Sequence, residues 1–159
     1  RLDRIAVVNR IFIPMSSLLS TKDQKLLSAA LLKKGLRSTK QRASVFSSIL
    51  NKKDHPTADD ILLRVRKILP TISLATVYNC LETLVDCGLV RQVHFDRSST
   101  RFCPNLSPHA HFKCSDSGKI YDLSLDDESV KSLQKILPQG FKALNFELSF
   151  SGSVNHNLH

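Results

Sequence analysis

Apolar residues recur every three or four positions in four successive stretches between residues 21 and 88, which is the period of an amphipathic helix. A hydroxyl residue three positions before a Gln predicts the first two helix starts, with Thr21 paired to Gln24 and Ser38 paired to Gln41. Four helices are therefore predicted in this part of the chain. The other predicted boundaries are Thr57 and Ser73 at helix starts, and Gly35, Pro70 and Gly88 at helix ends.

The period changes to two after Gly88, as expected for strands. Leu89–Phe95 and Thr100–Cys103 flank a polar turn and are predicted to form a hairpin. Helices that pack together with a hairpin beside the last one make up the winged-helix plan, in which a helix enters the DNA groove and the wing touches phosphate. A small α+β domain of another kind is the alternative.

A second unit follows, so the predicted fold class is α+β, with an N-terminal winged-helix domain and a small C-terminal α/β dimerisation domain. It contains a hairpin over Phe112–Cys114 and Lys119–Leu123, and a helix over Asp126–Leu137. About 50 residues are marginal as an independent core, so a second copy of the chain is expected to cover the apolar face. A strand is predicted from the alternating apolar residues Leu144, Phe146, Leu148 and Phe150.

The chain of 159 residues carries a net charge of +9, which favours a polyanionic partner such as nucleic acid. Its four cysteines include no Cys-x-x-Cys pair, which fits a reduced, cytoplasmic compartment better than a disulfide framework. No apolar run approaches the length of about 20 residues that spans a bilayer, so no membrane partner is expected. Residues 1–14 are interpreted as an upstream or added extension, with Met15 as the biological start.

The fourth predicted helix has an outer face of small, neutral, hydrogen-bonding residues, which suits entry into the major groove of DNA. Tyr78 lies at the flank of this face, and Arg97 at the tip of the wing is expected to touch phosphate. Glu82 counts against the interpretation, because phosphate repels an acidic side chain. The outer face consists of Ala75, Thr76, Asn79, Glu82 and Thr83.

A metal site is predicted near the start of the second unit. His109 and His111 project from the same face of an extended strand, so two imidazoles can reach one point. Cys103 can reach that point across the loop, and Asp122 can add a carboxylate. Thiolate, imidazole and carboxylate suit a divalent metal, with zinc the easiest fit. The alternative is a solvated strand face beside a cysteine that acts as a small buried hydrophobe.

The same residue types could serve a metalloenzyme, but an enzyme is not expected. Catalysis would need a positioned base, as in His-Glu-x-x-His or His-x-Glu, and neither pattern occurs. A membrane-surface protein would need a basic amphipathic helix with exposed aromatic residues, and none is visible.

Four stretches resemble the ferric uptake regulator superfamily of metal-responsive transcription factors: Gly35–Arg42 (GLRSTKQR), His55–Ile61 (HPTADDI), Ile72–Val90 and Arg101–Leu123. The resemblance implies a homodimer that binds a palindromic double-stranded operator. It implies a winged-helix domain over residues 15–102, a hinge loop over 103–108 and a dimerisation and metal-sensing domain over 109–159. Metal at the hinge would close the arms onto DNA by shifting the population towards the closed form.

Residue roles follow from the matching positions only. The resemblance makes Arg37 the minor-groove residue and Tyr78 the base-contacting residue, with Asn79 and Thr76 beside it. It implies one regulatory divalent metal per subunit. The implied metal ligands are His55, Cys103, His109, His111 and Asp122.

Two departures from the family pattern affect the cofactors. Most members hold a structural zinc with two Cys-x-x-Cys pairs, but here the first reads Cys114-Ser-Asp-Ser and the second is absent, so no tetracysteine zinc is expected. His55 within HPTADDI and the aspartate Asp122 resemble the peroxide-sensing branch, in which Fe²⁺ reacts with peroxide and a ligand histidine is oxidised. Cys103 instead resembles the zinc-sensing branch. The leading prediction is a repressor that senses peroxide with Fe²⁺ or Mn²⁺, and the alternatives are a Zn²⁺-responsive regulator and an iron-uptake regulator.

Overall fold

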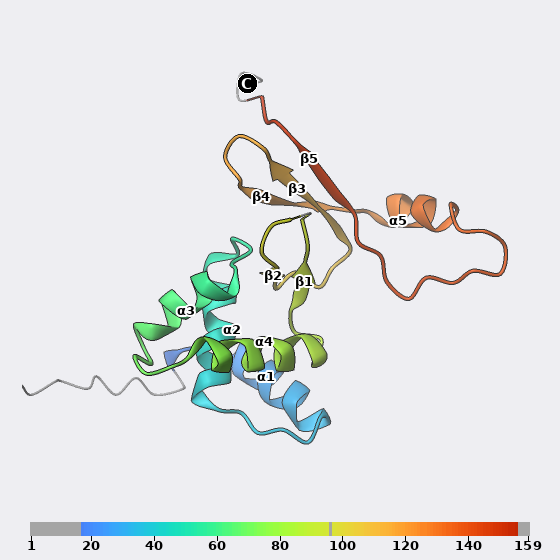
Figure 1. The fold of residues 1–159 in the computed structure, drawn as a ribbon. Helices are drawn as coiled ribbons and strands as arrows, with labels where there is room; N and C mark the ends of the chain where they lie inside the picture. The colour runs from blue at the N-terminus through green and yellow to red at the C-terminus, as the bar shows by residue number, and fades with distance from the viewer. Residues whose placement is uncertain (1–16, 96, 156–159) are drawn as a thin grey trace, which may run out of the picture.

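The computed structural model of the chain describes residues 17–95 and 97–155. The predicted extension over residues 1–14 and the start at Met15 lie outside the described residues. Helices α1 to α4 gather at one end of the molecule, a three-stranded sheet lies at the other, and a hairpin lies between them (Figure 1). The elements are α1 Thr21–Lys33, α2 Lys40–Lys52, α3 Ala58–Arg66, α4 Leu74–Asp86, β1 Arg91–Val93, β2 Arg101–Cys103, β3 His109–Cys114, β4 Ile120–Ser124, α5 Asp127–Gln134 and β5 Ser149–Gly152.

The apolar faces of the first four helices form a single core. Helix α2 contacts α3 and α4, and α3 contacts α4. The hairpin follows α4 directly and pairs antiparallel, with Arg91 opposite Cys103. The α+β class and the helical unit followed by a wing-like hairpin are therefore confirmed. Fully buried side chains of this core are Leu27, Leu31, Val45, Phe46, Ile49, Ile61, Val65, Val77, Leu81 and Leu84.

Hydroxyl side chains cap the four helices of this unit. The caps predicted at Thr21 and Ser38 are wrong by one residue, because Ser20 and Thr39 cap these helices instead. In both places two hydroxyl residues are adjacent in the sequence, and the cap is the one that lies just outside the helix. The caps predicted at Thr57 and Ser73 are confirmed.

The C-terminal sheet has the strand order β4-β3-β5, with β3 antiparallel to β4 and parallel to β5. The predicted β3–β4 hairpin is confirmed, and its register sets His111 opposite Asp122. The strand predicted over residues 144–150 is wrong in extent, because β5 covers only Ser149–Gly152. Leu144 is 93% exposed, so the alternating apolar residues have little to pack against within one copy of the chain. Pairing with β3, and not the alternation itself, decides where the strand begins.

The segment after α5 leaves many apolar side chains exposed, and α5 itself buries none of its residues. Apolar side chains exposed in this number are expected where a partner covers them. We refer to these residues together as the C-terminal apolar face. It comprises Ile136, Leu137, Phe141, Leu144, Phe146 and Phe150.

The β1–β2 hairpin joins the two units, because it packs on the C-terminal sheet through a second, small core. The Arg91 guanidinium donates to the Leu106 carbonyl at 2.7 Å, which ties β1 to the loop between β2 and β3. The backbone N–H of His94 donates to the Glu147 carboxylate at 3.3 Å. The hairpin is thus held against the sheet by both apolar and polar contacts. The buried residues of this junction are Val93, Phe95, Cys103 and Ile120.

Candidate metal centre

His55 lies in the loop between α2 and α3, and it is buried. Its φ of 52° falls in the left-handed region, which costs a non-glycine residue about 1–3 kcal/mol. Strand β2 holds this loop in place. The Arg101 guanidinium donates to the His55 carbonyl at 2.9 Å, and the Phe102 N–H donates to the Pro56 carbonyl at 3.0 Å. The strained loop directs the imidazole of His55 towards the C-terminal sheet, where it meets Asp122.

His109 and His111 lie two residues apart on β3, so they share a face of the strand. Their Nε2 atoms are 3.0 Å apart, and both residues are buried. The Nδ1 atom of His109 lies 2.7 Å from the Ser107 carbonyl, which can only accept a hydrogen bond. His109 therefore carries its proton on Nδ1 and presents the Nε2 lone pair to the cluster.

Asp122 on β4 and Cys103 at the end of β2 complete the group. The Asp122 Oδ1 atom is 2.8 Å from His55 Nε2, 3.4 Å from His111 Nε2 and 3.7 Å from His109 Nε2. The Cys103 sulfur is 3.6 Å from His109 Nε2. The structure thus brings together the five residues that the sequence suggested, two of them from the N-terminal unit and its hairpin.

The charge states of the group follow from its burial. Burial raises the pKa of the Cys103 thiol to about 11, with help from the Asp122 charge. Burial also lowers the pKa of His111 to about 4, and the neighbouring His109 and His55 add to this shift. Burial opposes the charge of Asp122 as well, but hydrogen bonding and a neighbouring imidazole outweigh it, and its pKa stays below the ordinary value. At neutral pH the group holds an uncharged His111, a carboxylate and a thiol that must lose its proton to bind metal.

This donor set fits a divalent cation. The ligand atoms of His55, Cys103, His111 and Asp122 all lie within 4.8 Å of one another, and His109 Nε2 approaches three of them closely. Buried lone pairs facing each other at this distance are repulsive unless a proton or a cation lies between them. Imidazole nitrogens with one thiolate suit zinc, and imidazole with carboxylate also suits iron and manganese.

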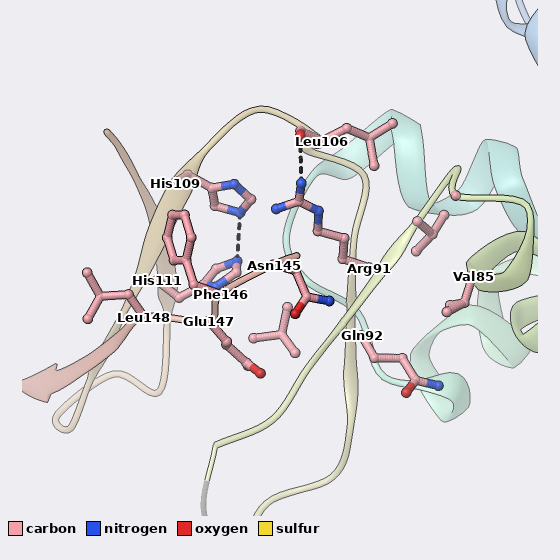
Figure 2. Close-up of a pocket in the computed structure, with 13 residues that line it drawn as sticks. Val85, Arg91, Gln92, Leu106, His109, His111, Asn145, Phe146, Glu147 and Leu148 are labelled. Atoms are coloured by element: carbon pink, nitrogen blue, oxygen red, sulfur yellow. Dashed lines mark hydrogen bonds between the residues drawn. The ribbon is translucent and has the colours of Figure 1, made fainter. Parts of the chain in front are cut away.

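A cavity of about 520 Å³ opens beside the two β3 histidines. Figure 2 shows His109 and His111 next to each other on one wall, with Arg91 reaching the Leu106 carbonyl across the top. Glu147 also lines the cavity, and its side chain points away from the histidines. Its neighbours in residues 145–148, which precede β5, line the cavity as well.

The residues predicted to contact DNA lie at the surface of three separate segments. Tyr78 and Asn79 are exposed on α4, and Thr76 is half-buried there, with its hydroxyl 2.9 Å from that of Ser73. Arg37 is exposed in the loop between α1 and α2, and Arg97 is exposed in the hairpin turn. Exposure on one unit is compatible with a shared DNA surface.

Sequence reasoning missed the polar residues around the ligands. Asn105, in the loop between β2 and β3, donates its amide Nδ2–H to Asp122 Oδ2 at 3.1 Å, and its backbone N–H donates to the Cys103 sulfur at 3.4 Å. Arg101 fixes the His55 loop. The one available signal was the Asn-x-Ser order after Cys103, which is typical of an Asx turn.

The fold and the site define a class: a helical unit with a wing-like hairpin, a second α/β unit, and a Cys/His/Asp cluster at their junction. This is the arrangement of a metal-responsive winged-helix regulator. Within the described part of the chain, no helix is both long and apolar enough to cross a membrane.

Comparisons with known proteins agree with this class. A sequence profile of the Ferric uptake regulator family matches residues 33–151. The peroxide-responsive repressor PerR of Staphylococcus epidermidis is 38% identical over 110 residues, which are 68% of this chain and 73% of the relative. The crystal structure of the Campylobacter jejuni peroxide stress regulator is 29% identical, with a TM-score of 0.64 over 84% of this chain and 97% of that one. The Vibrio cholerae ferric uptake regulator is 25% identical, with a TM-score of 0.66 over 80% of this chain and 99% of that one.

The chain belongs to the ferric uptake regulator family. Proteins of this family are metal-dependent transcription regulators and not enzymes, which confirms the predicted class of function.

Proposed function

We propose that this chain is a cytoplasmic repressor that binds a palindromic operator as a homodimer, and that peroxide is its signal, read through Fe²⁺ or Mn²⁺. The observation that carries the proposal is the 2.8 Å contact between His55, from the helical unit, and Asp122, from the C-terminal sheet. In this proposal residues 15–102 bind DNA, 103–108 form the hinge and 109–159 sense metal and dimerise.

The metal ligands in this proposal come from both sides of the hinge. His55 belongs to the helical unit and Cys103 lies where its hairpin meets the hinge, whereas His109, His111 and Asp122 belong to the sheet. An ion with ligands on both sides binds the closed arrangement better than an open one. Metal binding therefore shifts the population towards the closed form. Because the closed form binds DNA, the difference between the metal affinities of the closed and open forms raises the DNA affinity.

The DNA contacts in this proposal are made by α4, the wing and the loop before α2. Tyr78, with Asn79 and Thr76 beside it, reads base edges in the major groove, because amide, hydroxyl and phenol groups match the groove's donors and acceptors. Arg37 enters the minor groove and Arg97 pairs with phosphate. The exposure of all but Thr76, which is half-buried, supports these roles.

The dimer in this proposal forms without a structural zinc. Of the cysteines that would hold such an ion, the chain retains Cys114 alone at the β3–β4 turn. The C-terminal apolar face supplies the driving force, since it would be covered by the same face of a second copy.

Two features bear on the signal. The 38% identity to a peroxide-responsive repressor supports peroxide, and bound Fe²⁺ would supply the peroxide-reducing chemistry at this cluster. The ligand histidines His55, His109 and His111 are then the groups that can be oxidised, and an oxidised imidazole is a poorer metal ligand. Cys103 supports the alternative function, a zinc-responsive regulator, because a buried thiolate favours a soft or borderline ion.

The test uses protein purified without oxygen, with its metal content measured first. Operator binding is followed for the Fe²⁺ form and the redox-inert Zn²⁺ form, with and without a peroxide pulse. We expect peroxide to release DNA from the Fe²⁺ form only, with about 16 mass units added to a peptide that contains His55, His109 or His111. Tight binding of Zn²⁺ with no response of the Fe²⁺ form to peroxide would favour the zinc alternative. Release without any metal that vanishes in Cys103→Ser would refute both functions and indicate a thiol switch.

A further inference from the structure

Asn105 lies in the hinge loop, and its side chain hydrogen-bonds to Asp122 of the cluster and to the backbone of its own loop. Its Oδ1 accepts from the Ser107 N–H at 3.1 Å, and its Nδ2 donates to Asp122 Oδ2 at 3.1 Å. The Ser107 N–H can only donate, so it fixes which end of the amide faces Asp122. The donor end of Asn105 is therefore directed at the carboxylate.

The hydrogen bond from Asn105 makes the two oxygens of Asp122 unequal. Oδ2 is occupied by the amide, whereas Oδ1 faces His55 Nε2 at 2.8 Å and His111 Nε2 at 3.4 Å. A carboxylate held in this way presents one oxygen to an ion at the centre of the cluster. A carboxylate free of this bond could turn and bind through both oxygens, which would enlarge the coordination shell.

The Asn105 side chain has few other structural roles. It is half-exposed in a loop that belongs to neither apolar core, so the fold does not depend on its side chain. Its backbone N–H donates to the Cys103 sulfur, and this bond does not involve the side chain. A side-chain substitution therefore removes the contacts to Asp122 and to the Ser107 N–H, and it leaves the backbone contact to the thiol.

We propose that Asn105 is a positioning residue of the metal centre, which holds Asp122 to ligation through one oxygen. This inference rests on the proposed metal site, but not on the proposed peroxide signal or on DNA binding. Partners that orient a ligand in this way typically contribute 10–100-fold, in order of magnitude, to metal affinity.

The experiment measures Co²⁺ binding to the full chain by competition with a chelator, together with the visible absorption spectrum of the complex. Co²⁺ is the probe because its d–d bands respond to coordination number and its thiolate band reports the bond to Cys103. We expect Asn105→Ala to lower the Co²⁺ affinity by roughly 10–100-fold and to change the d–d bands, with the thiolate band retained. Ser107→Ala is the matched control, because Ser107 enters the network through its backbone. It should match the parent protein.

A double-mutant cycle tests whether Asn105 acts through Asp122. In the Asp122→Ala background, the further change Asn105→Ala should have little effect on Co²⁺ affinity. An equal loss in both backgrounds would overturn the inference, as would an Asn105→Ala protein that binds Co²⁺ like the parent with the same spectrum. A parent protein that takes up no Co²⁺ would overturn the inference and the metal site together, so the two failures are distinguishable.

Discussion

Acid should destabilise the metal-free protein between pH 6.5 and about pH 4, because the buried His111 resists protonation. Burial, with two imidazole neighbours, lowers the pKa of His111 from 6.5 to about 4 in the folded protein, whereas the unfolded chain keeps the ordinary value. As the pH falls through this window, the unfolded chain takes up the proton first. The contribution to stability is therefore complete above pH 6.5 and is lost as the pH falls through about 4.

The size of the effect follows from the shift. A change from 6.5 to about 4 corresponds to about 3 kcal/mol of unfolding free energy, at about 1.36 kcal/mol per pKa unit. The His111 side chain is only 6% exposed, so screening by solvent removes little of this value. The value is an upper bound, because local opening of the C-terminal unit would let His111 take up its proton without global unfolding.

The assay is urea unfolding followed by circular dichroism, in the presence of chelator, at several values from about pH 7 to about pH 4.5. His111→Gln should flatten the pH dependence, because the substituted side chain does not titrate. His94→Gln is the matched control, because it makes the same substitution at an exposed residue and leaves His111 in place. The reasoning is refuted if the parent protein shows no loss of stability in this window, or if His111→Gln shows the same loss.

Three further predictions concern DNA, the dimer and the metal. Tyr78→Ala should weaken operator binding about tenfold or more in a fluorescence titration. It should not lower the melting temperature, because Tyr78 is 51% exposed. Unchanged binding would exclude α4 as the recognition helix. Light scattering should show that the protein stays dimeric in a strong chelator, because the C-terminal apolar face and not a zinc ion is expected to hold the dimer together. Dissociation to monomers would contradict this. Cys103→Asp should lower the Zn²⁺ affinity markedly in a chelator competition, because a hard oxygen replaces the thiolate, and the variant should still bind Fe²⁺. An unchanged Zn²⁺ affinity would show that the sulfur is not a ligand.

The helical part of the fold was predictable because local signals and tertiary packing agree there. The spacing of the apolar residues indicates which helix faces are buried, and the hydroxyl caps predict the helix starts to within one residue. The strand near the C-terminus was not predictable in the same way. Alternation suggested residues 144–150, but the strand forms where β3 offers backbone partners, at Ser149–Gly152.

The ligand residues of the candidate site were easier to find than their supports. His109 and His111 share a strand face by spacing alone. Cys103 ends one hairpin that the pattern predicts, and Asp122 lies within the other. Nothing in the residue pattern places His55 there, because its position depends on a left-handed backbone held by strand β2. The resemblance to a family supplied that residue.

The strained loop at His55 links the proposed metal site to the helical unit. The loop is bonded to strand β2, so His55 moves with the hairpin and the helical unit, whereas Asp122 moves with the sheet. The hairpin already contacts the sheet through a small apolar core and through Glu147. An ion held by both His55 and Asp122 would add to these contacts, because its ligands lie on both sides of the junction. The response to metal should then be graded by how much each ion adds to these contacts, and a mutation that loosens the junction should make the response larger.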